Sequence, residues 1–128
     1  MKKLILITLL FLGMQTIVAQ TIVEKWKPFS EYHQLLSNTF HPSEEGDFGP
    51  IKQFSGELNR KAESLDITSI PKEFKTPKIE STVTLLKKQT KFVDELVKVK
   101  APNAEIMRAF EDLHDIFHRI VLLSKEEE

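Results

Sequence analysis

The stretch AEIMRAFEDLHDIFHRIVLLS, residues 104–124, decides how this chain folds. Its large apolar residues recur at steps of three and four, and they are Ile106, Phe110, Leu113, Phe117 and Ile120. Because an α-helix has 3.6 residues per turn, this spacing puts all of them on one face of a helix. The stretch therefore predicts an amphipathic helix that must bury one apolar stripe against other elements.

Three further segments carry the same periodicity and predict helices over residues 22–40, 51–65 and 77–98. The first stripe consists of Trp26, Phe29, His33, Leu36 and Phe40; the second of Ile51, Phe54, Leu58, Ala62 and Leu65; the third of Ile79, Val83, Leu86, Thr90, Val93 and Val97. Prolines and glycines mark a connection over residues 41–50. A second connection covers residues 66–76, where Ile70 and Phe74 are expected to pack on the core, and KAPN forms a short third one.

Four amphipathic helices with these connections predict an all-α protein, an up-down-up-down antiparallel four-helix bundle, with residues 21–128 as one domain. In such a bundle the first and last helices are antiparallel neighbours. If Ile22 lies level with about Leu123, Phe40 lies level with about Glu105 and His33 with about Asp112.

The first 20 residues, MKKLILITLLFLGMQTIVAQ, have the pattern of a secretory signal peptide. Two lysines precede an apolar run that is too short to span a bilayer, and small or polar residues follow near Ala19 and Gln20, where cleavage is expected. We therefore expect a periplasmic or secreted protein without a stable membrane span after cleavage. An uncleaved anchor is the alternative.

The composition excludes several kinds of functional site and of binding partner. The chain has no cysteine, which excludes disulfides, thiolate metal ligands and covalent c-type haem attachment. Of the 18 Lys and Arg residues two lie in the first 20 positions, with none of the 19 Asp and Glu residues, so the rest has 16 basic and 19 acidic residues and a formal charge of −3. This mild acidity argues against nucleic acid as a partner.

Two histidines, His114 and His118, stand four residues apart in the last predicted helix. Neutral imidazole is a good ligand for zinc, copper and nickel, and two histidines one turn apart can hold one metal ion. His33 is expected to face this pair across the helix interface, and Asp115 or Glu111 is a candidate additional ligand. The alternative is that these histidines are satisfied or exposed side chains with no ligand.

The residues His41, Glu44, Glu45 and Asp47 in the first connection are candidate ligands of a weaker second cation site. Their spacing matches no calcium loop. In the alternative interpretation His41 packs at a helix end and the three acids favour the start of the next helix through its dipole.

The chain from residue 21 onward, with its preceding leader, resembles the small exported bundles of the cytochrome b562 and cytochrome c′ type, notably in the Phe117–His118 pair near the end of the last helix. The resemblance implies that His118 is an axial ligand of a non-covalent haem b, with His33 where b-type members have a methionine. The motif C-x-x-C-H is absent. The stretches TFHPSEEGD and LHDIFH are also similar to uncharacterised exported bacterial proteins that lack the haem motif.

Three functions follow from these observations. The first is metal buffering or delivery through histidines, and the second is electron transfer by a b-type haem protein. The third is a non-catalytic module that binds an envelope protein or itself to form a homo-oligomer, for which Leu35, Leu122 and Leu123 are the available apolar residues. An enzyme fits least, since no nucleophile with a nearby base and no phosphate-binding loop occurs.

Overall fold

The computed structural model describes residues 21–126, and over this range the chain is all-helical. The long helices are α3 (Lys27–Glu44), α4 (Gly49–Glu63), α5 (Pro77–Lys98) and α6 (Asn103–Glu126). A short helix, α2 (Ile22–Lys25), precedes them, and two 3₁₀ turns, η1 (Ile67–Ser69) and η2 (Lys72–Phe74), separate α4 from α5. No strand occurs in this range, which confirms the predicted all-α class. The predicted signal peptide lies outside the described residues.

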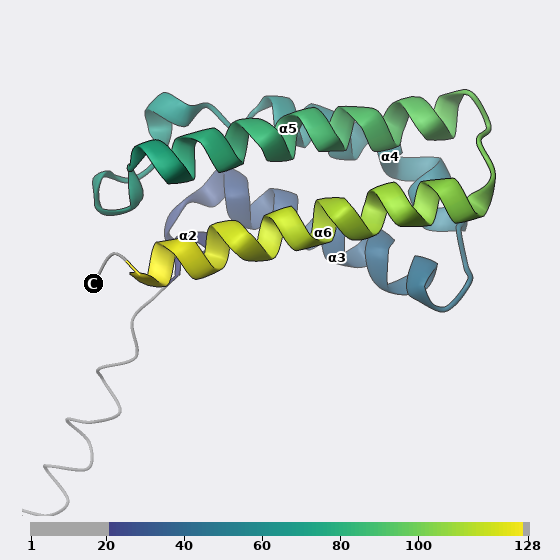
Figure 1. Ribbon diagram of the computed structural model, residues 1–128, viewed down its shortest axis with the longest axis horizontal. Coiled ribbons are helices and arrows are strands. Elements are labelled where there is room, and N and C mark those ends of the chain that lie inside the picture. Colours follow the sequence, from purple (N-terminus) through teal and green to yellow (C-terminus); the bar gives the residue numbers. More distant parts are fainter. Residues whose placement is uncertain (1–20, 127–128) are drawn as a thin grey trace, which may run out of the picture.

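Each long helix contacts the next one along the chain, and α3 also contacts α6. The most extensive contact joins α5 to α6, which Figure 1 shows side by side, with α4 behind α5 and α3 behind α6. The stripe on α6 is buried along its whole length, from Ile106 to Ile120. Within the described part of the chain, no helix combines the length and the apolar character needed to cross a membrane.

The prediction of one continuous helix over residues 22–40 is wrong in one respect, because the observed helix is interrupted at Trp26. This residue has extended backbone angles (φ −113°, ψ 99°) and separates α2 from α3. Pro28 explains the break, since in a continuous helix its ring would clash with the carbonyl of Glu24 and it has no N–H to donate. The Trp26 indole is buried and donates a hydrogen bond to Ser69 Oγ at 3.1 Å. The tryptophan thus joins the break to η1.

The restart of the helix also changes which side chains face the core. Tyr32 is fully buried, whereas His33, predicted to lie inside the apolar stripe, is half-buried. The Tyr32 hydroxyl and Thr90 Oγ1 share a hydrogen bond of 2.8 Å, and Thr90 Oγ1 also donates to the Leu86 carbonyl. The buried phenol is therefore satisfied by a side chain on α5.

α3 continues four residues beyond the predicted end at Phe40 and includes Pro42. The proline leaves the carbonyl of Asn38 without a helical N–H, but Asn38 is exposed, so water can satisfy that group. The helix stops before Gly46, whose positive φ of 92° suits glycine. The predicted connection 41–50 is thereby reduced to residues 45–48.

The second connection carries the predicted contacts. Ile70 and Phe74 are buried against the core, as expected from the sequence. α4 ends at Glu63, slightly before the predicted residue 65. Thr76 Oγ1 accepts a hydrogen bond from the N–H of Ile79 at 3.2 Å, and Pro77 opens α5. The predicted cap and first turn of this helix are therefore confirmed.

Candidate histidine site

His114 and His118 are in direct contact on α6. Their Nε2 atoms are 3.2 Å apart, and the ring centroids are 4.4 Å apart with planes at 77°. One ring that carries its proton on Nε2 donates to the other ring, so the contact is a hydrogen bond for one choice of tautomers. The structure therefore brings the two Nε2 atoms of this pair together at the surface of α6.

An aromatic side chain from α3 supports the first of these rings. His114 stacks on Phe40 with ring centroids 4.0 Å apart and planes at 3°. Phe40 is buried and also contacts Phe110 edge-on at 5.1 Å. His114 is consequently half-buried, whereas His118 is exposed. The pair thus has one fixed ring and one ring open to solvent.

His33 lies on the same side of the molecule but on a different aromatic ring. It stacks on Phe117 at 5.0 Å, and its Nε2 is 3.4 Å from Ser37 Oγ. Phe117 also stacks on Phe29 at 4.7 Å and lies edge-on to His118 at 6.1 Å. The structure therefore brings His114 and His118 together. His33, on α3, instead packs on Phe117, the residue before His118.

The predicted register between α3 and α6 needs correction. Phe40 lies level with Phe110 and His114 rather than with Glu105, and His33 lies level with Phe117 rather than with Asp112. The prediction treated residues 22–40 as one continuous helix. The break at Trp26 removes that assumption, and aromatic stacking between the two helices determines how they are aligned.

Burial and the charges of neighbouring histidines both lower the pKa of His33 and His114. Burial lowers the pKa of His33, and the charges of His118 and His41 lower it further. Burial is also the main cause that lowers the pKa of His114, followed by the charge of His118. His33 and His114 are therefore neutral near pH 7, the state in which imidazole can coordinate a metal.

The acidic residues predicted as additional ligands do not contact the pair. Asp115 and Glu111 are both exposed on α6. The negative charge of Asp115 raises the pKa of His114, against the larger effect of burial. Glu111 precedes His114 by three residues and His118 by seven, which places it on the same helix face. In the described chain, no three or more His, Asp or Glu side chains already surround one point.

The weaker second site is dispersed. His41 Nδ1 and Glu44 Oε1 are 3.2 Å apart on the exposed last turns of α3, and their charges also act on His114. Asp47 Oδ1 instead accepts the N–H of Gly49 at 3.0 Å, which stabilises the turn before α4. Glu45 is exposed. The His41–Glu44 pair thus lies on the His114 side of the protein, while Asp47 has a structural role.

Two features of the structure were not predicted from the sequence: the aromatic support of the histidines and the exposed apolar residues on α5. Phe40 and Phe117 were interpreted only as core residues, although each is a platform for a histidine. Of the apolar residues predicted for an interaction surface, Leu122 is 58% exposed, but Leu35 and Leu123 are half-buried. The exposed apolar residues on α5, including Phe92, were not predicted as a surface.

Comparison with models of known protein families, with curated proteins and with solved structures finds no match for this chain.

Proposed function

We propose that this protein binds one transition metal ion through His114 and His118 and buffers or delivers that ion in an exported compartment. The observation that carries this proposal is the 3.2 Å distance between the two Nε2 atoms. Zinc binds imidazole nitrogen at about 2.0–2.1 Å in a tetrahedral arrangement, so two nitrogens on one zinc ion lie about 3.3–3.4 Å apart. The pair therefore needs a movement of only a few tenths of an ångström.

Zinc is the ion that fits this geometry best. A right angle at the metal, as in square-planar copper or nickel sites, would bring the nitrogens to about 2.8 Å. On binding, the ring that donates in the metal-free pair would move its single proton from Nε2 to Nδ1, so that both Nε2 lone pairs are available to the metal and no net proton is released. The support from Phe40 fixes the His114 ring in advance, so less side-chain freedom is lost on binding.

Two protein ligands leave coordination positions for water or for a further side chain. Glu111 shares the helix face of the pair, and His33 stacks on the ring of Phe117, which precedes His118. An incompletely enclosed ion exchanges with other ligands more readily than the closed four-ligand sites that zinc uses for structural purposes. This openness favours buffering or delivery over a structural role.

The proposed scaffold is an up-down-up-down antiparallel four-helix bundle exported by the predicted signal peptide. The contacts of each long helix with the next, together with the α3–α6 contact, support the bundle. The haem alternative needs a flat slot between two helices. Phe29, Phe117 and His33 stack between α3 and α6, which makes the metal ion the better supported of the two ligands.

The test is zinc titration of the untagged chain without residues 1–20, followed by calorimetry and native mass spectrometry. One zinc ion per chain is expected for the wild type and for His41→Ala, and no stoichiometric binding for the double variant His114→Ala, His118→Ala. Helical circular dichroism of each variant shows whether it is folded. Unchanged zinc binding by the folded double variant would contradict the proposal, and a Soret band on haem addition would favour the haem alternative.

A further inference from the structure

α5 carries a second apolar stripe that faces solvent. Leu85 and Phe92 of α5 and Val99, the residue that caps its C-terminal end, are 41%, 47% and 73% exposed, and they follow one another at intervals of seven residues. Gln89 and Leu96 complete steps of four, three, four and three along this stripe. Such spacing is the pattern of a helix that packs along another helix. The core-facing stripe of α5 uses other residues, and within residues 21–126 the side chains of Leu85, Phe92 and Val99 on the second stripe stay exposed.

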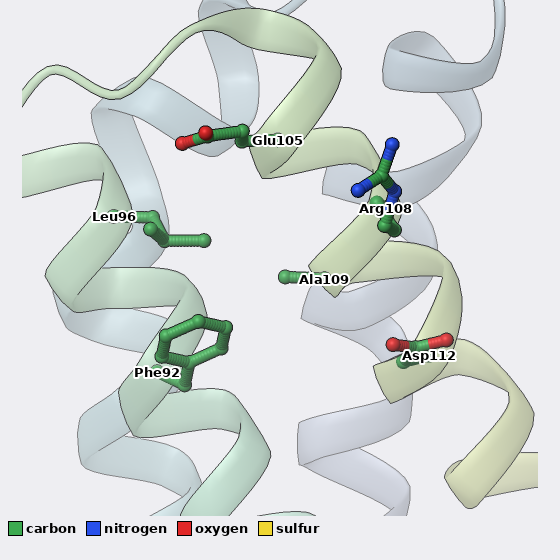
Figure 2. Close-up of a pocket in the computed structure, with 6 residues that line it drawn as sticks. All are labelled: Phe92, Leu96, Glu105, Arg108, Ala109 and Asp112. Carbon is green, nitrogen blue, oxygen red and sulfur yellow. The ribbon is translucent and has the colours of Figure 1, made fainter.

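A shallow groove of about 300 Å³ runs beside this stripe, between α5 and α6. Figure 2 shows Phe92 and Leu96 on one wall and Ala109 on the other. Ala109 leaves space because its side chain is small, and its carbonyl accepts a hydrogen bond from Gln89 Nε2 at 3.0 Å. This hydrogen bond joins the two helices beside the groove.

The exposed apolar residues of this stripe are evenly spaced about Phe92. Leu85 lies seven residues before it and Val99 seven residues after it. In a two-fold contact the same residues meet in reciprocal pairs, so an antiparallel second copy would place Leu85 against Val99 of the other copy and the two Phe92 rings together. A second copy of this chain therefore offers the complementary pattern.

The charges favour the same antiparallel arrangement. Lys88 and Lys91 lie before Phe92, whereas Glu95 lies after it, and all three line a shallow surface with Leu85 and Phe92. Antiparallel pairing puts Lys88 of one copy beside Glu95 of the other, and it does so twice. A parallel in-register pair would not bring these two opposite charges together. The α6 side of the groove adds Glu105, Arg108 and Asp112, a net charge of −1.

We infer that the exposed face of α5, defined by Leu85, Gln89, Phe92, Leu96 and Val99, binds the same face of a second copy in antiparallel orientation. A contact between single helices buries less than about 1,200 Å², which places it among weak, reversible interfaces. The dimer is thus expected to be weak and to form only at high protein concentration. This inference is independent of the metal site, which lies on the α3–α6 side.

Sedimentation velocity over a concentration series tests the inference, with EDTA present so that zinc cannot bridge two chains. The wild type is expected to shift from monomer to dimer. Phe92→Lys should raise the dissociation constant more than tenfold, whereas the matched control Leu122→Lys, at an exposed leucine of α6, should leave it unchanged. Circular dichroism confirms that both variants are folded.

A charge exchange tests the orientation. Lys88→Glu and Glu95→Lys should each weaken the dimer, and the double variant should restore it, because the two residues then attract across the interface again. A wild type that stays monomeric at all concentrations would overturn the inference, and so would a dimer that Phe92→Lys leaves intact. A double variant no stronger than the single ones would overturn the antiparallel pairing.

Discussion

His114 lies flat against Phe40, with ring centroids 4.0 Å apart and planes within 3° of parallel. The phenylalanine comes from α3 and the histidine from α6, so one contact aligns two helices and orients a potential metal ligand. Phe40 itself is held edge-on by Phe110. A core residue is therefore in direct contact with the candidate site. Substitutions that change the packing of Phe40 should also change the affinity for metal.

Phe40→Leu should separate these two roles of the ring. The leucine keeps most of the apolar volume, so the loss of stability is expected to stay near 1–1.5 kcal/mol. The flat surface under His114 is lost, and zinc affinity should fall several-fold because the imidazole is no longer held in place. Urea unfolding without metal and zinc calorimetry measure the two effects.

Phe74→Leu is the matched control. Phe74 is also buried, but it lies in η2 and not at the histidines. This variant should lose comparable stability and keep the zinc affinity of the wild type. Equal affinity losses in the two variants would show that Phe40 acts only through general packing.

Local patterns explain why the helices were predictable and their alignment was not. Burial of one face leaves a period of 3.6 in the sequence, and the cap at Thr76 with Pro77 is a local signal. Pro28 is a local signal for the break at Trp26, because a proline at this position cannot continue a helix from the residues before it. The alignment of α3 on α6 depends on pairs such as Phe40 and His114, which are far apart in the sequence.

The histidine site was also predictable only in part, because one of its contacts lies within a helix and the other lies between two helices. The contact between His114 and His118 follows from a spacing of four residues in one helix. The position of His33 depends on its stacking on Phe117 across the helix interface, which no spacing within one segment encodes. Both stripes of α5 contain repeats of seven residues, and only the contacts with the other helices determine which of the two faces the core.

Stability without metal should rise with pH across the titration of the buried histidines. Burial lowers the pKa of His33 and His114 in the folded chain, so between that pKa and the unfolded value of about 6.5 the unfolded chain binds more protons. Their contribution is present above the unfolded pKa and is lost as pH falls toward the folded pKa. Urea unfolding in EDTA from about pH 5 to pH 8 measures the slope.

The double variant His33→Gln, His114→Gln provides the control for this pH dependence. Glutamine does not titrate, so the free energy of unfolding should vary less with pH between these limits. A slope equal to that of the wild type would assign the pH dependence to other groups. NMR titration of the imidazole protons checks the direction of each pKa shift directly.

A buried carboxylate on α5 provides a prediction independent of the histidines. Asp94 is buried, accepts a hydrogen bond from Ser55 Oγ at 2.8 Å and pairs with Lys98 Nζ at 2.8 Å. Ser55→Ala leaves the carboxylate with one donor fewer and should cost about 1–3 kcal/mol. The control Ser64→Ala removes an exposed hydroxyl and should stay within about 0.5 kcal/mol of the wild type in urea unfolding.

Zinc should stabilise the folded chain by an amount that grows with the logarithm of the free zinc concentration once this exceeds the dissociation constant. Because the pair exists only in the folded helix, a free zinc concentration of 100 times the dissociation constant should add about 2.7 kcal/mol to the free energy of unfolding. The single variant His118→Gln removes one ligand from the exposed ring and leaves the Phe40–His114 stack untouched, so it should unfold as the wild type does without zinc and gain little when zinc is added. Urea unfolding with zinc and with EDTA separates the two contributions. A gain in His118→Gln as large as in the wild type would place the zinc elsewhere on the chain.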